Sequence, residues 1–170
     1  MVETPAKKPV KKPAPNRSLR RKQAARLVAI RALYAEHFND DEHSLTVDAW
    51  ADKLIAAQQE AIHNDDEETA FSEAPERAML VTLLESAGQH ESVADELIAA
   101  TMGEKWNAER MGPLLESILR VAIAELMAKK DRNASIIISE YVLLTEAYFD
   151  DSEVSFVNGI LASIAKKLRD

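Results

Sequence analysis

The sequence contains few of the residues that interrupt helices or stabilise small oxidised domains. It has no cysteine, four glycines and six prolines among 170 residues, and aromatic residues make up only 5%. Without cysteine the chain can form neither a disulfide nor a thiolate metal site, which fits a reducing compartment. No apolar run approaches the roughly 20 residues needed to cross a bilayer, and no apolar block follows the N-terminal lysines as in a signal peptide. We therefore expect a cytoplasmic protein without a membrane partner.

Sequence signals for catalysis are also scarce. The four histidines are scattered, and no two stand four residues apart on a helix as a metal-binding pair would. No glycine-rich phosphate loop and no GxSxG nucleophile motif occurs. The acids of residues 63–69 lack the spacing and the glycine of a calcium-binding loop. We expect no enzyme, no cofactor and no metal site.

Helix-forming sequence, in contrast, is abundant. Hydrophobic residues amount to 46%, with many Ala, Leu, Ile, Glu and Lys residues. Apolar residues recur at helical spacing in seven segments. These predicted helices are 18–38, 47–62, 73–88 (with Ser72 as N-cap), 92–102, 113–130, 133–149 and 153–168. The sequence therefore predicts an all-α protein of about seven helices in one compact bundle-like domain, residues 17–170, after a disordered basic tail at 1–16.

Two of these segments need closer inspection. The three consecutive isoleucines at 136–138 could form a strand, but the apolar spacing around them is helical and no partner strand is evident, so a helix is favoured. The segment 113–130 is apolar around most of its circumference, which predicts a central helix. Glu125 lies on the margin of its apolar face. We expect Glu125 to be paired, with an arginine of the first helix as the candidate partner, rather than catalytic.

Charge is distributed unevenly along the chain. Residues 1–26 contain nine cations and one acid (net +8), whereas the rest contains 12 cations and 28 acids (net −16). A basic segment on an acidic protein usually binds a polyanion, although a solubilising tail is the alternative for the lysines at 7–12. In the first predicted helix, cations border an apolar stripe on both edges. The stripe consists of Leu27, Ile30, Tyr34 and Phe38, and the bordering cations are Arg20, Lys22, Arg26 and Arg31.

Two aromatic residues are candidates for either packing or binding. Phe156 stands one residue from the apolar stripe of the last helix, where it would be an edge-packing residue or an exposed stacking platform; edge packing is favoured. Tyr34 points its ring inward in this interpretation, while its hydroxyl needs water or a partner. Cations beside aromatic surface are what single-stranded RNA requires.

Three blocks of the sequence also carry a family resemblance. They are AARLVAIRALY at 24–34, ILRVAIAEL at 118–126 and IISEYVLLTEAYFDDSEVSFVNGIL at 137–161. Together they resemble the NusB family of bacterial transcription antitermination factors. The resemblance covers roughly residues 17–168 and is weakest at 39–105. The FVNGIL motif at its distance from ILRVAIAEL is its most specific part.

The resemblance implies a fold of two small helical subdomains and a noncatalytic adaptor. Such an adaptor binds single-stranded boxA RNA together with the ribosomal protein NusE, joins other Nus factors on RNA polymerase, and suppresses termination in ribosomal RNA operons. The implied RNA-binding residues are Arg17, Arg20, Arg21, Lys22, Arg26, Arg31 and Phe156. The implied partner-binding residues are Tyr34, Tyr148, Ser152 and Phe156. Phe156 thereby gains a functional role in addition to packing.

Some positions depart from the family pattern, and other interpretations remain open. Arg31 stands where the family commonly has glutamine, and Ser152 where an acidic residue is expected near the partner surface. The RNA-binding domain of rRNA cytosine methyltransferases resembles the same fold, but we expect no methyltransferase here, since the sequence has neither room for that domain nor a catalytic cysteine. A helical protein-interaction or self-associating module with an incidental basic tail is the main alternative.

Overall fold

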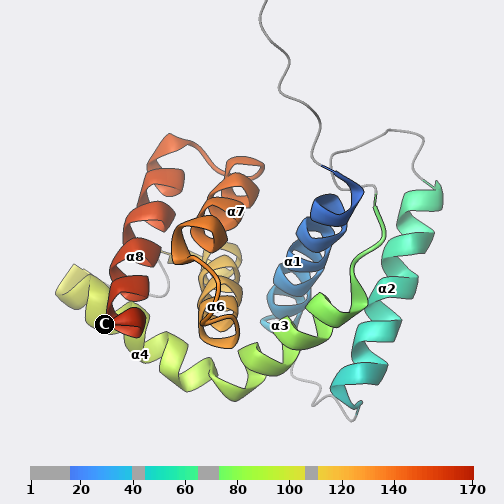
Figure 1. Ribbon diagram of the computed structural model, residues 1–170, viewed down its shortest axis with the longest axis horizontal. Coiled ribbons are helices and arrows are strands. Elements are labelled where there is room, and N and C mark those ends of the chain that lie inside the picture. The colour runs from blue at the N-terminus through green and yellow to red at the C-terminus, as the bar shows by residue number, and fades with distance from the viewer. Residues whose placement is uncertain (1–15, 40–44, 65–72, 106–110) are drawn as a thin grey trace, which may run out of the picture.

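The structure, a computed structural model, describes residues 16–39, 45–64, 73–105 and 111–170. Within these ranges it contains seven α-helices, one short 3-10 helix and no strand (Figure 1). The elements are α1 (Arg17–Glu36), α2 (Val47–Asn64), α3 (Arg77–Gln89), α4 (Glu91–Met102), η1 (Gly103–Lys105), α6 (Pro113–Ala128), α7 (Ala134–Glu146) and α8 (Asp151–Arg169). The predicted all-α fold of about seven helices is confirmed.

The helix α6 lies between two groups of helices. It packs against α1 and α3 on one side and against α4, α7 and α8 on the other, while α2 covers α3 and α1 at the edge of the molecule (Figure 1). Ten of its residues are buried, including Leu119, Val121 and Ile123. Burial on nearly all sides follows from the apolar circumference of its sequence, and it confirms the predicted central helix.

Local sequence explains where several helices begin and end. The side chain of Asn16 caps α1 by accepting a hydrogen bond from the Leu19 amide, at 2.9 Å. Gly103 has a φ of 60° and ends α4, as predicted, because glycine adopts this conformation without steric cost. The helix α3 begins at Arg77 rather than near residue 73. Pro75 disfavours helical backbone at Ala74, so the helix cannot start before the proline, and the N-cap Glu76 is extended. The predicted cap Ser72 and residues 1–15 of the predicted tail lie outside the described residues.

The segment with three isoleucines is helical, as predicted, and it packs inward. Ile137, Tyr141 and Leu144 of α7 are fully buried, beside the apolar stripe of α8. None of the helices in the described ranges is long and apolar enough to span a bilayer.

The end of the predicted apolar stripe of α1 needs correction. Leu27 and Ile30 are buried, but Tyr34 is 37% exposed and Phe38 is 63% exposed. The helix ends at Glu36, so Phe38 lies beyond it, and the ring of Phe38 packs edge-to-face on Tyr34 with 5.1 Å between centroids. The result is an exposed aromatic pair where the sequence predicted inward packing.

Candidate nucleic-acid interface

The first turns of α1 carry four cations, and the first turn contains no acid. The partial positive charge at a helix N-terminus favours acids there and disfavours cations. The helix α8 follows this rule, with Asp151 and Glu153 in its first turn and basic residues in its last. The charge order of α1 therefore does not serve the stability of the helix, and it favours a negatively charged ligand. The four cations are Arg17, Arg20, Arg21 and Lys22.

The extended residues before α3 contact several of these cations. Glu73 forms an ion pair with Arg17 at 3.2 Å and another with Arg20 at 3.3 Å. Arg21 donates from Nε to the carbonyl of Ala74 at 3.3 Å. The side chains of Arg17 and Arg20 stay 79% and 37% exposed, whereas that of Glu73 is 19% exposed. Solvent reaches the cation of each pair and screens it, and surface pairs contribute about 0–1 kcal/mol. A polyanion could therefore displace Glu73 at small cost.

Arg26 has a different environment, inside the protein. Its guanidinium binds both carboxylate oxygens of Glu125, at 2.8 Å each, and its side chain is 3% exposed. Gln23 accepts a further bond from Arg26 at 3.2 Å, and Glu140 lies 3.5 Å away. Burial alone would lower the pKa of Arg26, but the hydrogen bonds and charge of Glu125 outweigh burial and raise it. The predicted pairing of Glu125 with an arginine of the first helix is confirmed.

This burial corrects the interpretation of Arg26 as an RNA contact. Its charge is neutralised internally, and its donors point away from solvent, so it cannot reach a phosphate without unfolding the network. Tyr141 of α7 completes that network by donating from its hydroxyl to Glu125 Oε2 at 2.6 Å. Burial, and then the negative charge of Glu125, raises the pKa of Tyr141. The network fixes α1 against α6 and α7.

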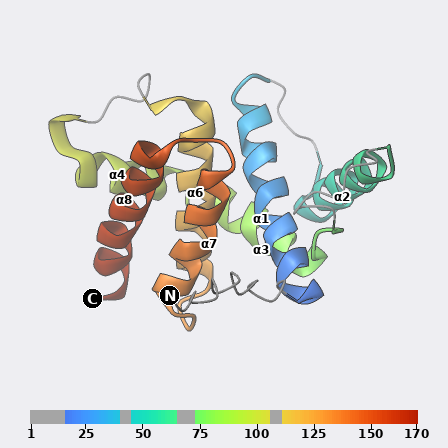
Figure 2. The same cartoon turned by 90° about the horizontal axis from the view of Figure 1, so that it is seen from above.

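The helices α1 and α7 run in the same direction and are bridged by polar side chains. Gln23 donates to the carbonyl of Glu140 at 3.1 Å, and Arg31 donates to the hydroxyl of Tyr148 at 3.3 Å. Both bridges join residues 117 positions apart, so the two segments keep a constant register. We call this line of contact between the two helices the α1–α7 seam. It is defined by Lys22, Gln23, Arg31, Glu140 and Tyr148, of which Gln23 is buried. Figure 2 shows both helices starting at one side of the molecule and running toward the turn between α7 and α8.

The predicted site residues fall into two groups at opposite ends of this seam. The four cations that begin α1 lie at one end, and Arg31 and Tyr148 meet at the other. Phe156 of α8 is half-buried and packs against the core, as expected of an edge-packing residue. Ser152 is exposed and donates to Glu153 at 2.9 Å. The structure therefore places Arg31, rather than the first cations of α1, beside the α7–α8 turn.

Two further groups of residues were missed from the sequence. Phe38 was assigned to the core, but its exposed ring is available for stacking beside Tyr34. The loop between α6 and α7 carries three cations and lies near the start of α1, where its side chains and Lys22 line one hollow. The basic run KKDR at 129–132 was the available signal.

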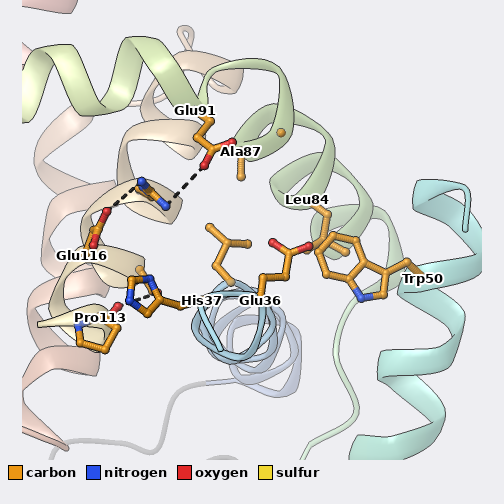
Figure 3. Close-up of a pocket in the computed structure, with 12 residues that line it drawn as sticks. Glu36, His37, Trp50, Leu84, Ala87, Glu91, Pro113 and Glu116 are labelled. Carbon is orange, nitrogen blue, oxygen red and sulfur yellow. Dashed lines mark hydrogen bonds and ion pairs between the residues drawn. The ribbon is translucent and has the colours of Figure 1, made fainter. Parts of the chain in front are cut away.

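A separate cavity of about 380 Å³ lies between α1, α2, α3, the start of α4 and α6 (Figure 3). Its charged wall includes Arg120, which pairs with Glu116 at 2.8 Å and with Glu91 at 3.5 Å. Burial would lower the pKa of Arg120, but its bonds to Asp95 and the neighbouring carboxylates raise it. Three glutamates line this cavity, so it does not suit an anion. In the described ranges no group of three or more His, Asp or Glu side chains could hold a metal ion.

The fold and the seam define an all-α protein that presents a cationic helix N-terminus on an acidic body. Residues 23–166 match the model of the NusB family. The chain belongs to the NusB family.

Named relatives agree with this assignment. The transcription antitermination protein NusB of Novosphingobium aromaticivorans is 30% identical over 146 residues, which cover 86% of this chain and 93% of the relative. The protein of the same name from Rhodospirillum rubrum is 27% identical over 157 residues, covering 88% and 85%.

Solved structures share the fold. The T. maritima NusB structure superposes with a TM-score of 0.64 at 25% identity, covering 86% of this chain and 91% of that chain. A chain from the crystal structure of antitermination factors NusB and NusE in complex with dsRNA gives a TM-score of 0.63 at 21% identity, covering 88% and 98%.

Proposed function

We propose that the protein is a noncatalytic RNA-binding adaptor of transcription antitermination that acts in the cytoplasm. With the ribosomal protein NusE it binds single-stranded boxA RNA, engages other Nus factors and RNA polymerase indirectly, and suppresses termination in ribosomal RNA operons. The observation that carries the proposal is the cluster of cations at the start of α1, where the helix dipole disfavours them. Membership of the NusB family and the names of the relatives support it.

The RNA contacts follow the α1–α7 seam. Arg17, Arg20, Arg21 and Lys22 would bind phosphates at one end, and Arg31 would do so at the other. The exposed rings of Tyr34 and Phe38, with the outer edge of Phe156, would offer surface for unpaired bases. Base stacking on an aromatic side chain contributes about 1–3 kcal/mol per base. Arg26 is left out of this set because its guanidinium is buried.

The protein partner would bind around the α7–α8 turn. Tyr34, Tyr148 and Ser152 are exposed, and Phe156 is half-buried. Leu143 on the outer side of α7 is 55% exposed, and Asp150, Asp151 and Glu153 surround Ser152. This combination of apolar and acidic surface suits a basic ribosomal protein, and the acidic body also limits nonspecific binding to RNA.

A salt-dependent titration tests the proposal. A labelled boxA-like strand and a scrambled strand are titrated with the protein in the presence of NusE, at several salt concentrations. We expect preference for the boxA-like strand. Log affinity falls as log salt rises, and for single strands the slope is about −0.7 for each phosphate that the protein neutralises. Arg21→Gln and Lys22→Gln should therefore each make the slope less steep, reducing its magnitude by about 0.7. The control is Lys53→Gln, which removes one charge from an exposed position of α2.

Two outcomes would contradict the proposal. One is equal affinity for the two strands, and the other is an unchanged slope in both α1 variants. In either case the self-associating interaction module becomes the leading interpretation, because Ile136 and Leu143 leave apolar surface on α7. Sedimentation of the protein alone over a range of concentrations would then measure that association.

A further inference from the structure

The loop between α6 and α7 brings a second set of cations to the start of α1. Lys129 and Arg132 of this loop line a hollow of about 410 Å³ together with Lys22 of α1. Glu76 and Asp131 line it as well, so cations outnumber acids by three to two. Lys130 stands exposed on the same loop and adds a further positive charge. The hollow is therefore a local basic site on a protein whose net charge is −8.

In the described part of the chain, these cations form no ion pairs. Among the described residues, the ion pairs include none of Lys22, Lys129, Lys130 and Arg132. Arg17 and Arg20, in contrast, both pair with Glu73. The loop cations are therefore less neutralised by neighbouring acids than the arginines in the first turn of α1.

The last helix holds the loop in place. The guanidinium of Arg169 donates to the carbonyls of Leu126, Lys129, Lys130 and Arg132. Carbonyls at a helix C-terminus carry partial negative charge, and a cation placed there neutralises it. Arg169 therefore masks the end of α6 that would otherwise repel a phosphate.

The start of α7 adds to the same field. This helix begins at Ala134, directly after the loop, and has no acid in its first turn. Its positive dipole end lies beside the cationic side chains, and a helix N-terminus is favourable for anions. The loop, the N-terminus of α7 and Lys22 therefore all contribute positive potential that attracts an anion.

We propose that the loop 129–132 is a second phosphate-binding element, which receives the RNA backbone where the strand leaves the start of α1. The inference rests on the proposed function and extends it to residues outside α1. Lys22 belongs to both elements, so one strand can pass from the first turns of α1 onto the loop without crossing the acidic body. We favour RNA over an acidic protein as the ligand because the hollow continues the cationic start of α1. Evenly spaced phosphates of one strand can contact cations of both elements.

The test uses the full chain with NusE and the boxA-like strand. Lys129→Gln and Arg132→Gln each remove one charge from the loop, and Lys53→Gln is again the matched control. We expect each loop variant to reduce the magnitude of the negative slope of log affinity against log salt by about 0.7, and the control to leave the slope unchanged. If circular dichroism shows that either variant unfolds more easily, Lys130→Gln, at an exposed position of the same loop, replaces it.

The outcomes separate the inference from the function on which it rests. If the unmodified protein prefers the boxA-like strand but the loop variants keep its slope, the loop is not a phosphate site while the proposed function stands. If the unmodified protein shows no preference, both fail. A drop in NusE affinity measured without RNA, with an unchanged RNA slope, would assign the loop to an acidic patch of the protein partner and would also overturn the inference.

Discussion

Arg26 and Glu125 form a buried bidentate ion pair, in which Nε and Nη2 of the arginine each lie 2.8 Å from a different carboxylate oxygen. The pair joins α1 to the central helix α6, and Tyr141 of α7 donates to the same carboxylate. Three helices therefore meet at one carboxylate. This arrangement separates the cations of α1 into two groups, because Arg26 supports the fold while the cations before it are those that we propose to bind RNA.

The first prediction concerns the stability of this pair. Arg26→Leu leaves Glu125 buried without its cation, and removing one partner of such a pair costs about 3–5 kcal/mol of unfolding free energy. Arg26→Leu combined with Glu125→Leu should cost less, because no uncompensated charge remains. Urea denaturation followed by circular dichroism measures both. An Arg26→Leu variant of normal stability with weakened RNA binding would return Arg26 to the RNA-binding set.

The second prediction concerns alkaline pH. The pKa of Tyr141 is raised above its ordinary value of 10.0, so its contribution to stability is complete below pH 10 and is lost as pH rises through the folded-state pKa. Tyr141→Phe should cost about 1–3 kcal/mol at neutral pH through the lost bond to Glu125, and it should lose less stability between pH 9 and 11. Urea denaturation of both proteins across that range measures the difference. Parallel pH curves would contradict the assignment.

The helices were predictable from sequence where a long apolar stripe decides the structure. The segment 113–130 was predicted and α6 spans 113–128, because its apolar circumference admits only a central position. The pairing of Glu125 was predictable for the same reason, since an acid in such a helix must be neutralised. The start of α3 was missed because Pro75 shortens it.

The functional surface was harder to predict than the helices. Spacing along α1 does not tell how wide its buried face is, so Arg26 was assigned to the surface and Phe38 to the interior, the reverse of what the structure shows. The role that we propose for the loop 129–132 depends on its proximity to Lys22, which arises from packing of distant segments and from the bonds of Arg169. Periodicity within single helices carries no information about such packing.

A third prediction concerns the acid that occupies the start of α1. Glu73→Gln removes the carboxylate that pairs with Arg17 and Arg20, so both cations become available to phosphate. Affinity for the boxA-like strand should rise at low salt, while the unfolding free energy changes by less than about 1 kcal/mol because the arginine of each pair is open to solvent and screened. Glu60→Gln, an exposed acid of α2, controls for the change in net charge. Equal affinity gains in the two variants would indicate a general charge effect rather than release of Arg17 and Arg20.

The last prediction concerns Arg169, which contacts four carbonyls at the end of α6 and in the following loop. Arg169→Lys keeps the charge but loses the planar fork that reaches several acceptors at once, so we expect a loss of about 1–3 kcal/mol in unfolding free energy. We also expect weaker RNA binding, because the loop cations are no longer held beside Lys22.

A double-mutant cycle separates positioning by Arg169 from general destabilisation. If Arg169 acts on RNA binding through the loop, its substitution should weaken binding in the native background and have much less effect once Lys129→Gln and Arg132→Gln are present. RNA titrations of the four proteins at a temperature where all are folded supply the cycle. Additive losses would show that Arg169 stabilises the fold without positioning the loop for RNA.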